Sequence, residues 1–568
     1  MVGKFNKIKL LLIVIIFLLT LIIPITFADQ VIVNSQDWRD VYTGMMFAKL
    51  NSHSGQYIID EGHGLLMQDN LVKNKDVIVI ESVNSPYIKN FNTNLETKGH
   101  KTTVNFVEEN YNLEIAKTLD VDGYIIIDDR YSYNAVSVSP YAIRKNYYVL
   151  FANEDNIAEV KEIIDSKDST NILIYGFVDR IVTNELSVYN PIIINKGEKF
   201  SNNLEILKMF VDEFGANQLI ITNGAFLEPQ FFLSNNPVLF IGTTNVPDQT
   251  ISYLQNSDVK HALLIGYDVF DNAVSLKSKV GMKIIVKFAK GVDSKQYALD
   301  IYELPQVKYN IGISSVNYNT YTKKLEVSYY NIGDFPAFVK GSHSVLQNNN
   351  TILAVGDDKS IFIGSDETLT VSYDAELSDI EKLILKSNIL YGEDRGALEF
   401  LQIVENSITS INYEDDSDIE IKEVYYNKQT KRIHVELENT GNVNLIAKPL
   451  IIDLVVNNKL ETLTTQPMEI LLKNSQTFKI KARLTPEDIE DNKEIKVGVR
   501  FGKREDALIR YKEDTFEFKI KLVSDAMLIG GSVILIITII IILTIIISKK
   551  KKKHHRRHKL HPAPPPKK

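Results

Sequence analysis

Two patterns of hydrophobic and polar positions divide the chain. In residues 31–305, short apolar runs alternate with segments of helical spacing. The runs, such as YIII at residues 124–127, are apolar at every position, which is typical of parallel strands buried on both faces. Between them, the spacing of Ile157, Val160 and Ile164 predicts an amphipathic helix. We therefore expect strand–helix–strand units, with parallel sheets and flanking helices.

This first region repeats itself. NLEIAK at residues 112–117 recurs as NLEILK at residues 203–208, 91 residues later, and each copy leads into an apolar run. Three units align as strand, polar loop, helix with small residues, strand, helix and strand, and they begin near Val31, Tyr124 and Leu219. Similarity at a fixed period indicates a repeat architecture.

After residue 305 the pattern changes to alternation of apolar and polar residues, as in KLEVSY at residues 324–329. Such alternation, broken by frequent turn residues, predicts antiparallel sandwiches. This region is duplicated as well, because VNYN from Val316 corresponds to VYYN from Val424, an offset of 108 residues. Asn-x-Gly turns that begin at Asn331 and Asn439 predict a tight hairpin in each copy.

The two ends of the chain carry the strongest hydrophobic signals. Residues 526–547 contain 22 residues without a charge, and a helix of that length spans about 33 Å, enough to cross a bilayer. At the other end, three lysines precede an apolar stretch, and small residues up to Ala28 predict signal cleavage after Ala28. The basic segment after the span predicts a cytoplasmic C-terminus. We therefore expect a single-pass membrane protein with a large external part.

Charge and cysteine content narrow the function further. Without the three lysines of the signal and the ten basic residues of the tail, 51 basic residues face 72 acidic ones. So acidic an external part makes nucleic-acid binding there improbable. The chain has no cysteine, which excludes disulfides and thiol chemistry. The tail at residues 548–568 is expected to contact anionic lipid.

The triple repeat resembles the cell-wall-binding repeat 2 family, in which three Rossmann-like units form one module. The resemblance covers about residues 29–290 and is carried by the NLEIxK segments and by the third unit, which ends in HALLIGY at residues 261–267. It implies a three-lobed module that binds a wall polymer. The Arg-x-x-Thr of the family is replaced by NYNL from Asn110 and by SNNL from Ser201, and its double glycine by Gly266-Tyr267.

Candidate ligand-binding residues follow the first strand of two repeats. Open α/β sheets bind ligands at the carboxyl ends of their strands. There, Trp38 and Arg39 follow the first run, and Asp128, Asp129 and Arg130 follow the run at residues 124–127. An aspartate pair can hold a cation, and either arginine can hold a carboxylate or phosphate. The alternative is that these side chains cap helices and pair with one another, with Trp38 buried.

No motif points to catalysis or to a cofactor. The glycine-rich nucleotide loop, the Gly-x-Ser-x-Gly elbow and the His-Glu-x-x-His zinc motif are missing. We therefore expect no catalytic residue, no metal and no cofactor. Asn349 lies in an Asn-x-Thr sequon and is a candidate glycosylation site.

These patterns predict an α/β three-repeat module plus two all-β sandwich domains, immunoglobulin-like in type, and one transmembrane helix. The expected parts are a signal peptide at 1–28, the repeat module at 29–304, sandwiches at 305–410 and 411–524, the span at 526–547 and the tail at 548–568. We expect a surface protein that binds an envelope polymer or associates in a surface layer. The alternatives are an exported enzyme acting on a wall glycan or peptide, and an adhesin or receptor that binds through its sandwiches.

Overall fold

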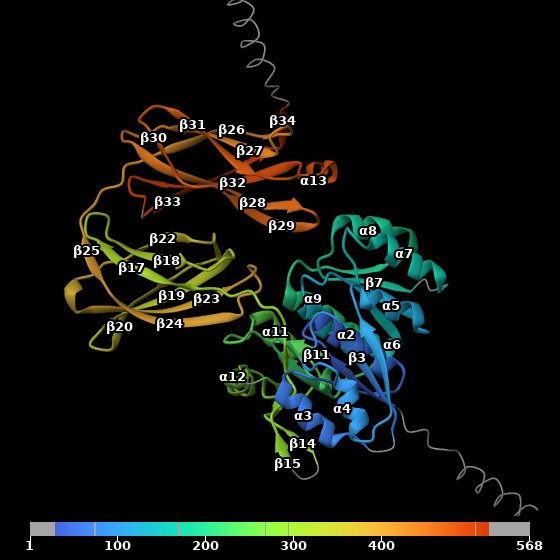
Figure 1. Ribbon diagram of the computed structural model, residues 1–568. Helices are drawn as coiled ribbons and strands as arrows, with labels where there is room; N and C mark the ends of the chain where they lie inside the picture. The colour runs from blue at the N-terminus through green and yellow to red at the C-terminus, as the bar shows by residue number, and fades with distance from the viewer. Residues whose placement is uncertain are drawn as a thin grey trace, which may run out of the picture. The chain divides into compact units, whose positions relative to one another are not determined.

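The computed structural model describes residues 29–72, 75–167, 171–266, 268–292, 295–505 and 507–521. Parallel α/β repeats come first and antiparallel sheets follow, as predicted (Figure 1). The predicted signal peptide, its cleavage site, the membrane span and the tail lie outside the described residues. Within the described ranges, no helix is both long and apolar enough to cross a membrane.

The first part contains three lobes, each with a four-stranded parallel sheet. Lobe 1 has the strand order β2-β1-β3-β4, lobe 2 the order β6-β5-β7-β8, and lobe 3 the order β11-β9-β12-β13. In each lobe the first strand pairs with the second on one side and with the third on the other. The shared topology confirms the repeat that the sequence predicts.

The elements of the lobes are best given in chain order. Lobe 1 consists of β1 (Gln30–Asn34), α2 (Trp38–Leu50), β2 (Ser54–Tyr57), α3 (Glu61–Asn70), β3 (Val77–Ser82), α4 (Phe91–Thr97) and β4 (Thr102–Val107). Lobe 2 consists of α5 (Tyr111–Thr118), β5 (Gly123–Ile127), α6 (Tyr133–Lys145), β6 (Tyr147–Phe151), α7 (Ile157–Ser166), β7 (Ile172–Tyr175), α8 (Arg180–Leu186), η1 (Ser187–Tyr189) and β8 (Ile192–Ile194). Lobe 3 consists of α9 (Lys199–Phe214), β9 (Gln218–Thr222), β10 (Phe226–Leu227), α10 (Gln230–Leu233), β11 (Val238–Phe240), α11 (Asp248–Asn256), β12 (His261–Ile265), α12 (Phe270–Val280) and β13 (Lys283–Lys287).

The three lobes share one hydrophobic core. Helices α2, α6 and α10, one from each lobe, contact one another, and buried residues from all three lobes form a single cluster. Tyr57 also joins lobe 1 to lobe 3, because its hydroxyl donates to the carbonyl oxygens of Leu227 (2.9 Å) and Asp300 (2.7 Å). The lobes therefore form one folded module rather than three independent domains.

Two β sandwiches with matching strand orders follow three short strands. Those are β14 (Lys290–Val292), β15 (Lys295–Tyr297) and β16 (Tyr302–Glu303). Sandwich 1 pairs the sheet β22-β18-β17-β25 with the sheet β20-β19-β23-β24, and sandwich 2 pairs β31-β27-β26-β34 with β29-β28-β32-β33. The described residues fall into two compact units divided between Asp415 and Asp416, except that Val455–Glu461 and Arg504–Ile509 belong to the first. The finer domain boundaries stay predictions.

The sandwich elements are again given in chain order. Sandwich 1 consists of β17 (Ile311–Asn319), β18 (Lys324–Asn331), β19 (Ala337–Gln347), β20 (Asn350–Gly356), β21 (Ile361–Ile363), β22 (Glu367–Asp374), η2 (Ile380–Lys382), β23 (Leu383–Gly392), β24 (Phe400–Ser407) and β25 (Thr409–Ile411). Sandwich 2 consists of β26 (Ile419–Asn427), β27 (Arg432–Asn439), β28 (Leu445–Val456), β29 (Lys459–Thr464), β30 (Met468–Ile470), β31 (Ser475–Lys481), α13 (Pro486–Asp491), β32 (Glu494–Gly502), β33 (Arg510–Glu517) and β34 (Lys519–Lys521).

The hairpins predicted at the two Asn-x-Gly turns are wrong. The strands on either side of the first turn, β18 and β19, belong to different sheets, and so do β27 and β28 around the second. Asn331 instead ties the sheets together, since its side-chain amide donates to the carbonyl oxygens of Phe335 (2.8 Å) and Gly364 (3.0 Å). Asn439 repeats this arrangement with Val443 and Ile470. A sequence turn cannot show whether the chain returns to the same sheet.

Candidate cleft between lobes 1 and 2

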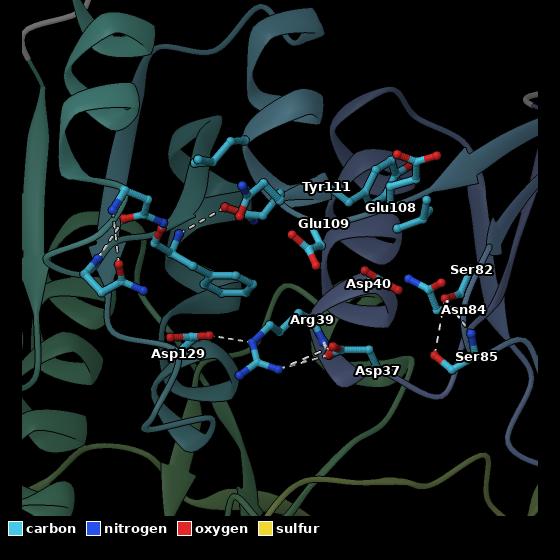
Figure 2. A pocket seen from close by; sticks show the side chains of 17 residues that line it. Asp37, Arg39, Asp40, Ser82, Asn84, Ser85, Glu108, Glu109, Tyr111 and Asp129 are labelled. Atoms are coloured by element: carbon cyan, nitrogen blue, oxygen red, sulfur yellow. Dashed lines mark hydrogen bonds and ion pairs between the residues drawn. The ribbon is translucent and has the colours of Figure 1, made fainter.

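A cavity of about 360 Å³ lies at the carboxyl ends of the lobe 1 strands. Its lining includes residues that follow β1, β3 and β4, together with residues from lobe 2 (Figure 2). In this sheet β1 lies between β2 and β3, so the chain leaves β1 toward one edge of the sheet and leaves β3 toward the other. The loops that follow β1 and β3 therefore run in opposite directions and leave a crevice between them. We call this cavity the cleft. Its full lining is Asp37, Arg39, Asp40, Ser82, Asn84, Ser85, Val107, Glu108, Glu109, Asn110, Tyr111, Asn112, Leu113, Asp129, Phe151, Asn153 and Asn156.

The start of helix α2 forms one side of the cleft. Asp37 caps the helix, because its carboxylate accepts a hydrogen bond from the backbone amide of Arg39 at 2.8 Å. The Arg39 side chain then lies between two carboxylates, with Nε 2.5 Å from Asp129 Oδ2 and Nη1 3.3 Å from Asp37 Oδ1. Arg39 of lobe 1 and Asp129 of lobe 2, both predicted as ligand-binding residues, are thus in contact although they are 90 residues apart in sequence.

Asp40 lies in the first turn of the same helix, and the pKa of its carboxyl group is unusually high. Burial of its carboxyl raises the pKa to about 6, although a hydrogen bond from Ser35 and the charge of Arg39 act in the opposite direction. The nearby charge of Asp37 adds to the increase. Desolvation favours the neutral acid because a low dielectric penalises the charged form. Asp40 therefore changes charge close to neutral pH, within the cleft.

The opposite side of the cleft consists of the segment that enters helix α5. Figure 2 shows Glu108, Glu109 and Tyr111 across the cavity from Asp37, Arg39 and Asp129. Neither Glu108 nor Glu109 has a hydrogen-bond or ion-pair partner among the described residues. Together the lining holds five carboxylates and one guanidinium, a formal excess of four negative charges. The cleft therefore attracts cations and offers many hydrogen-bond acceptors.

Tyr111 adds an unsatisfied polar atom to this wall. The residue is 8% exposed, and within the described part of the chain its hydroxyl has no hydrogen-bond partner. Burial raises the pKa of this phenol, as does the charge of Asp40. A buried hydroxyl without a partner is unfavourable by about 1–3 kcal/mol. A ligand polar group in the cleft would remove that penalty.

Trp38 was a candidate for stacking on a ligand, but it is buried. It is 4% exposed and packs against Phe151, with 5.4 Å between ring centroids. The Arg39 guanidinium carbon lies 5.5 Å from the Trp38 ring. Trp38 thus supports the cleft residues from behind, as in the structural alternative considered from the sequence.

Asp128 and Arg130 belong to a different place, the equivalent crevice of lobe 2. Asp128 is fully buried and pairs with Arg130, which also reaches Asp179 at 2.7 Å. Asp179 follows β7, the third strand of that sheet, so this ion-paired group narrows the crevice. Lobe 3 narrows its crevice in a similar way, because Asn223 after β9 donates to Asp268 after β12 at 2.5 Å. A cavity of about 80 Å³ remains beside Arg130 and Asp179 in lobe 2, and lobe 1 differs in that its cavity is larger, about 360 Å³.

Several cleft residues escaped the sequence reasoning. Ser82, Asn84, Glu108 and Glu109 were not candidates, although each follows an apolar run. Applying the strand-end argument to the third and fourth runs of the first repeat would have found them. Tyr111 carries no such local signal, since only the fold shows that its hydroxyl is buried beside Asp40.

The remaining predictions concern metals and glycosylation. Among the described residues, no group of three or more His, Asp or Glu side chains is placed to hold a metal ion. Asn349 lies in the exposed turn between β19 and β20 with a positive φ of 65°. An enzyme could reach this position, and its glycosylation stays a prediction.

Comparison with known proteins gives similarity to solved structures only. No family model matches the chain, and no curated protein sequence matches it. Cwp8 from Clostridium difficile has a TM-score of 0.38 and 15% identity, over 45% of this chain and 48% of that chain. Cwp6 from Clostridium difficile has a TM-score of 0.38 and 17% identity, over 44% of each chain. The class 5 fimbriae chaperone CfaA has a TM-score of 0.14 and 11% identity, over 38% of this chain and 100% of that chain.

This chain spans about half the length of the Cwp8 and Cwp6 structures that it matches. The function proposed below therefore rests on the sequence and on the cleft.

Proposed function

We propose that this is a cell-surface protein whose three-lobed module binds an envelope polymer in the cleft. The predicted signal peptide and membrane span favour an external location for the module. The observation that carries the binding role is the cleft itself. The strand-end crevice of lobe 1 leaves about 360 Å³ lined with polar groups, whereas the equivalent crevice of lobe 2, where Arg130 pairs with Asp128 and Asp179, leaves about 80 Å³. Ligand sites in proteins commonly have this size.

The lining also favours binding without turnover. It contains no histidine or lysine, which can act as the base that activates a nucleophile, and no cysteine, which is itself a nucleophile. Its two serines lie next to each other, with 3.3 Å between the hydroxyl oxygens of Ser82 and Ser85. Carboxylates and amides without a general base of that kind are suited to hydrogen bonding with hydroxyl-rich ligands.

Sedimentation with isolated envelope tests this proposal. Residues 29–525, which lack both terminal apolar segments, should sediment with the protein-free glycan fraction of the envelope. The double variant Asp37→Asn, Glu109→Gln should lose most of this sedimentation, whereas Glu162→Gln on the exposed face of α7 should retain it. Failure of the unaltered fragment to sediment would reject the proposal. Equal sedimentation of all three would place binding elsewhere, as an adhesin acting through its sandwiches requires.

A second candidate function is hydrolysis of a glycan. Glycosidases pair a carboxylic acid of raised pKa with an ionised carboxylate, and Asp40 with its pKa of about 6 lies beside Asp37 in the same cleft. Release of new reducing ends from envelope glycan, lost in Asp40→Asn, would establish the enzyme. Binding without release of reducing ends supports the polymer-binding role.

A further inference from the structure

The contact between lobes 2 and 3 is the internal counterpart of the cleft. Both contacts are built on the asparagine of the repeated NLE segment. Asn112 accepts from the backbone amide of Phe151 at 3.0 Å, and Asn203 accepts from that of Phe240 at 2.8 Å. Each asparagine also donates to the carbonyl oxygen two residues before that phenylalanine, at 3.0 Å and 3.1 Å. Positions along β6 and β11 and in the loops that follow them can therefore be matched by counting from the two phenylalanines.

A segment of sandwich 1 fills the place between lobes 2 and 3 that corresponds to the cleft. Residues 393–399, which we call the plug, join β23 to β24. Glu399 of the plug pairs with Lys199 at 2.9 Å, and the two side chains are 11% and 6% exposed. The plug backbone is held as well, since Asn245 donates its side-chain amide to Leu398 O at 2.8 Å and its backbone amide to Glu399 O at 3.2 Å.

The cleft reverses the charge of this contact. Lys199 lies four residues before Asn203, and the residue four before Asn112 is Glu108. The segment before the anchor asparagine thus supplies a cation, Lys199, to the filled contact and two carboxylates, Glu108 and Glu109, to the open one. With the formal excess of four negative charges in the lining, this exchange selects a ligand with a positive charge.

The cleft also lacks the groups that hold a polypeptide backbone in the filled contact. Gly242, two residues after Phe240, admits the plug, since a Cβ there would lie 2.4 Å from Glu399 O. The residue two after Phe151 is Asn153, which carries a side chain where lobe 3 has a glycine, and this side chain accepts from the amide of Asp155 at 2.9 Å. The Asn156 side chain, in turn, donates to Phe151 O at 3.0 Å within its own loop. The groups that the cleft still offers to a ligand are therefore mostly hydrogen-bond acceptors. Few of them are donors that could bind the carbonyl groups of a polypeptide backbone.

We propose that the cleft binds amine-bearing sugar units of a glycan, with the ammonium group near Glu108 and the hydroxyls on Asp37, Glu109 and Tyr111. The proposal deepens the polymer-binding function and rests on it. Sugar hydroxyls donate hydrogen bonds to carboxylates, and the partnerless Tyr111 hydroxyl gains a partner in the complex. A basic peptide is the competing ligand, and the missing backbone-binding groups argue against it.

Calorimetric titration of the full chain in detergent with three probes tests this specificity. The probes are hexaglucosamine, its fully N-acetylated form, and hexalysine. Hexaglucosamine should bind at least ten times more tightly than the acetylated oligomer, because acetylation removes the charge. Glu108→Lys should reduce its affinity at least tenfold. Tyr111→Phe should reduce it several-fold without lowering the melting temperature. Glu162→Lys, the same charge change on the exposed face of α7, should have no effect.

Each other result contradicts the amine-bearing glycan. Equal affinity for both oligosaccharides would mean that the cleft binds neutral sugar, and hexalysine binding as tightly as hexaglucosamine would assign it to a basic peptide. Absence of binding to all three, with envelope sedimentation intact, would reject the amine specificity and leave the polymer-binding function in place. Loss of envelope sedimentation by the unaltered protein would reject both.

Discussion

At the scale of single residues, the cleft combines features that are unfavourable to folding. Asp40 is a carboxyl whose burial raises its pKa to about 6, and Tyr111 buries a hydroxyl that lacks a partner in the described structure. Such features concentrate at sites that bind ligands, because the ligand supplies the missing interactions. Trp38, in contrast, lies in an apolar environment and contributes packing.

Asp40→Asn should stabilise the free protein and weaken its ligand binding. The folded-state pKa of about 6 lies above the unfolded value of 3.8, so the folded state retains a proton between these values. Stability from this group is complete below the unfolded pKa and is lost as the pH rises through 6. Removing the charge should raise the free energy of unfolding at pH 7 by about 1–2 kcal/mol. Urea unfolding at pH 4 and pH 7 measures the difference, which should vanish at pH 4.

Ligand affinity should depend on pH in the opposite sense. Asp37, Arg39 and the phenols of Tyr111 and Tyr302 surround Asp40 electrostatically, and burial raises the pKa of Asp40 to about 6. An ammonium ligand prefers the ionised carboxylate, so hexaglucosamine should bind more tightly as the pH rises from 4.5 to 6, where its own amines remain protonated. A flat profile in the unaltered protein, or an unchanged slope in Asp40→Asn, would contradict this role.

At the scale of elements, the repeated NLE segment has a structural explanation. Its asparagine, Asn112 or Asn203, lies in the first turn of α5 or α9 and bonds to the strand that follows the central helix of that lobe. Asn112 also donates to Thr43 of lobe 1 at 3.2 Å, and Asn203 donates to Ser137 of lobe 2 at 2.7 Å. The repeated segment thus forms contacts between neighbouring lobes as well as contacts within each lobe.

Asn203→Ala should destabilise the three-lobed module strongly. The change leaves the backbone amide of Phe240 without its buried acceptor and removes the hydrogen bonds that Asn203 donates to Val238 O and to Ser137, whose hydroxyl keeps Tyr175 as a partner. One unsatisfied buried amide together with the lost hydrogen bonds corresponds to about 2–4 kcal/mol. Denaturant unfolding measures this value. Asn94→Ala, on the exposed side of α4, serves as the matched control and should change stability by less than about 0.5 kcal/mol.

Sandwich 1 contains a buried polar network that sandwich 2 lacks. His343 lies 2.8 Å from both the Tyr329 hydroxyl and the Ser387 hydroxyl, and the hydroxyls of Tyr329 and Tyr373 donate to Asp357. Strand pairing identifies the matching residues of sandwich 2, which are all apolar: Leu437, Ile451, Ile480 and Val497. The duplicated fold therefore needs none of these polar groups.

Acid should destabilise sandwich 1 through His343. Burial lowers the pKa of this imidazole to about 4, below the unfolded value of about 6.5. The histidine therefore contributes stability that is complete above pH 6.5 and is lost as the pH falls toward 4, about 3 kcal/mol in all. Thermal melts at pH 7.5 and pH 4.5 should show this loss.

Replacing the whole network with the residues of sandwich 2 should remove the acid sensitivity. The quadruple variant Tyr329→Leu, His343→Ile, Tyr373→Ile, Ser387→Val removes the histidine together with its hydroxyl partners and leaves Asp357 with the backbone amide of Gly341, so its stability should equal or exceed that of the unaltered protein at pH 4.5. His343→Ile alone should destabilise at both pH values, because it leaves the buried Ser387 hydroxyl without its histidine partner. Unchanged acid sensitivity in the quadruple variant would assign the effect to other groups.

At the scale of the molecule, the plug ties sandwich 1 to the three-lobed module. The buried pair of Lys199 and Glu399 is surrounded by aromatic rings, with Lys199 Nζ 5.1 Å from the centroid of Tyr133. Within the first compact unit, the module and the first sandwich are thus joined by polar contacts as well as by chain connection. A polymer bound in the cleft would therefore load both domains together.

Gly242→Ala should release the plug. The added Cβ would lie 2.4 Å from Glu399 O and 2.3 Å from Asn245 O, both backbone atoms that cannot move alone. We expect faster tryptic cleavage after Arg395, in the plug, by at least fivefold under native conditions. Gly396→Ala, where the nearest atom is 3.4 Å away, is the control and should cleave at the unaltered rate. Equal rates for both variants would mean that the plug is not held at Gly242.

The sequence by itself determined the classes of element and their repetition. Continuous apolar runs and alternating runs arise from burial on two faces or on one, a property of neighbouring residues that survives in any single sequence. The strand-end argument likewise placed Arg39 and Asp129 at a candidate site before the fold was known. The same argument could not distinguish these two residues from Asp128 and Arg130, which also directly follow an apolar strand.

Only the tertiary structure decided which polar strand ends meet and which close on themselves. Arg39 joins Asp129 across two lobes, whereas Arg130 is held by Asp128 and Asp179. The same limit explains the hairpins wrongly expected at the Asn-x-Gly turns, which instead connect two sheets. Contacts between residues far apart in the chain depend on how whole elements pack, and packing is set by the sum of many distant interactions rather than by a local pattern.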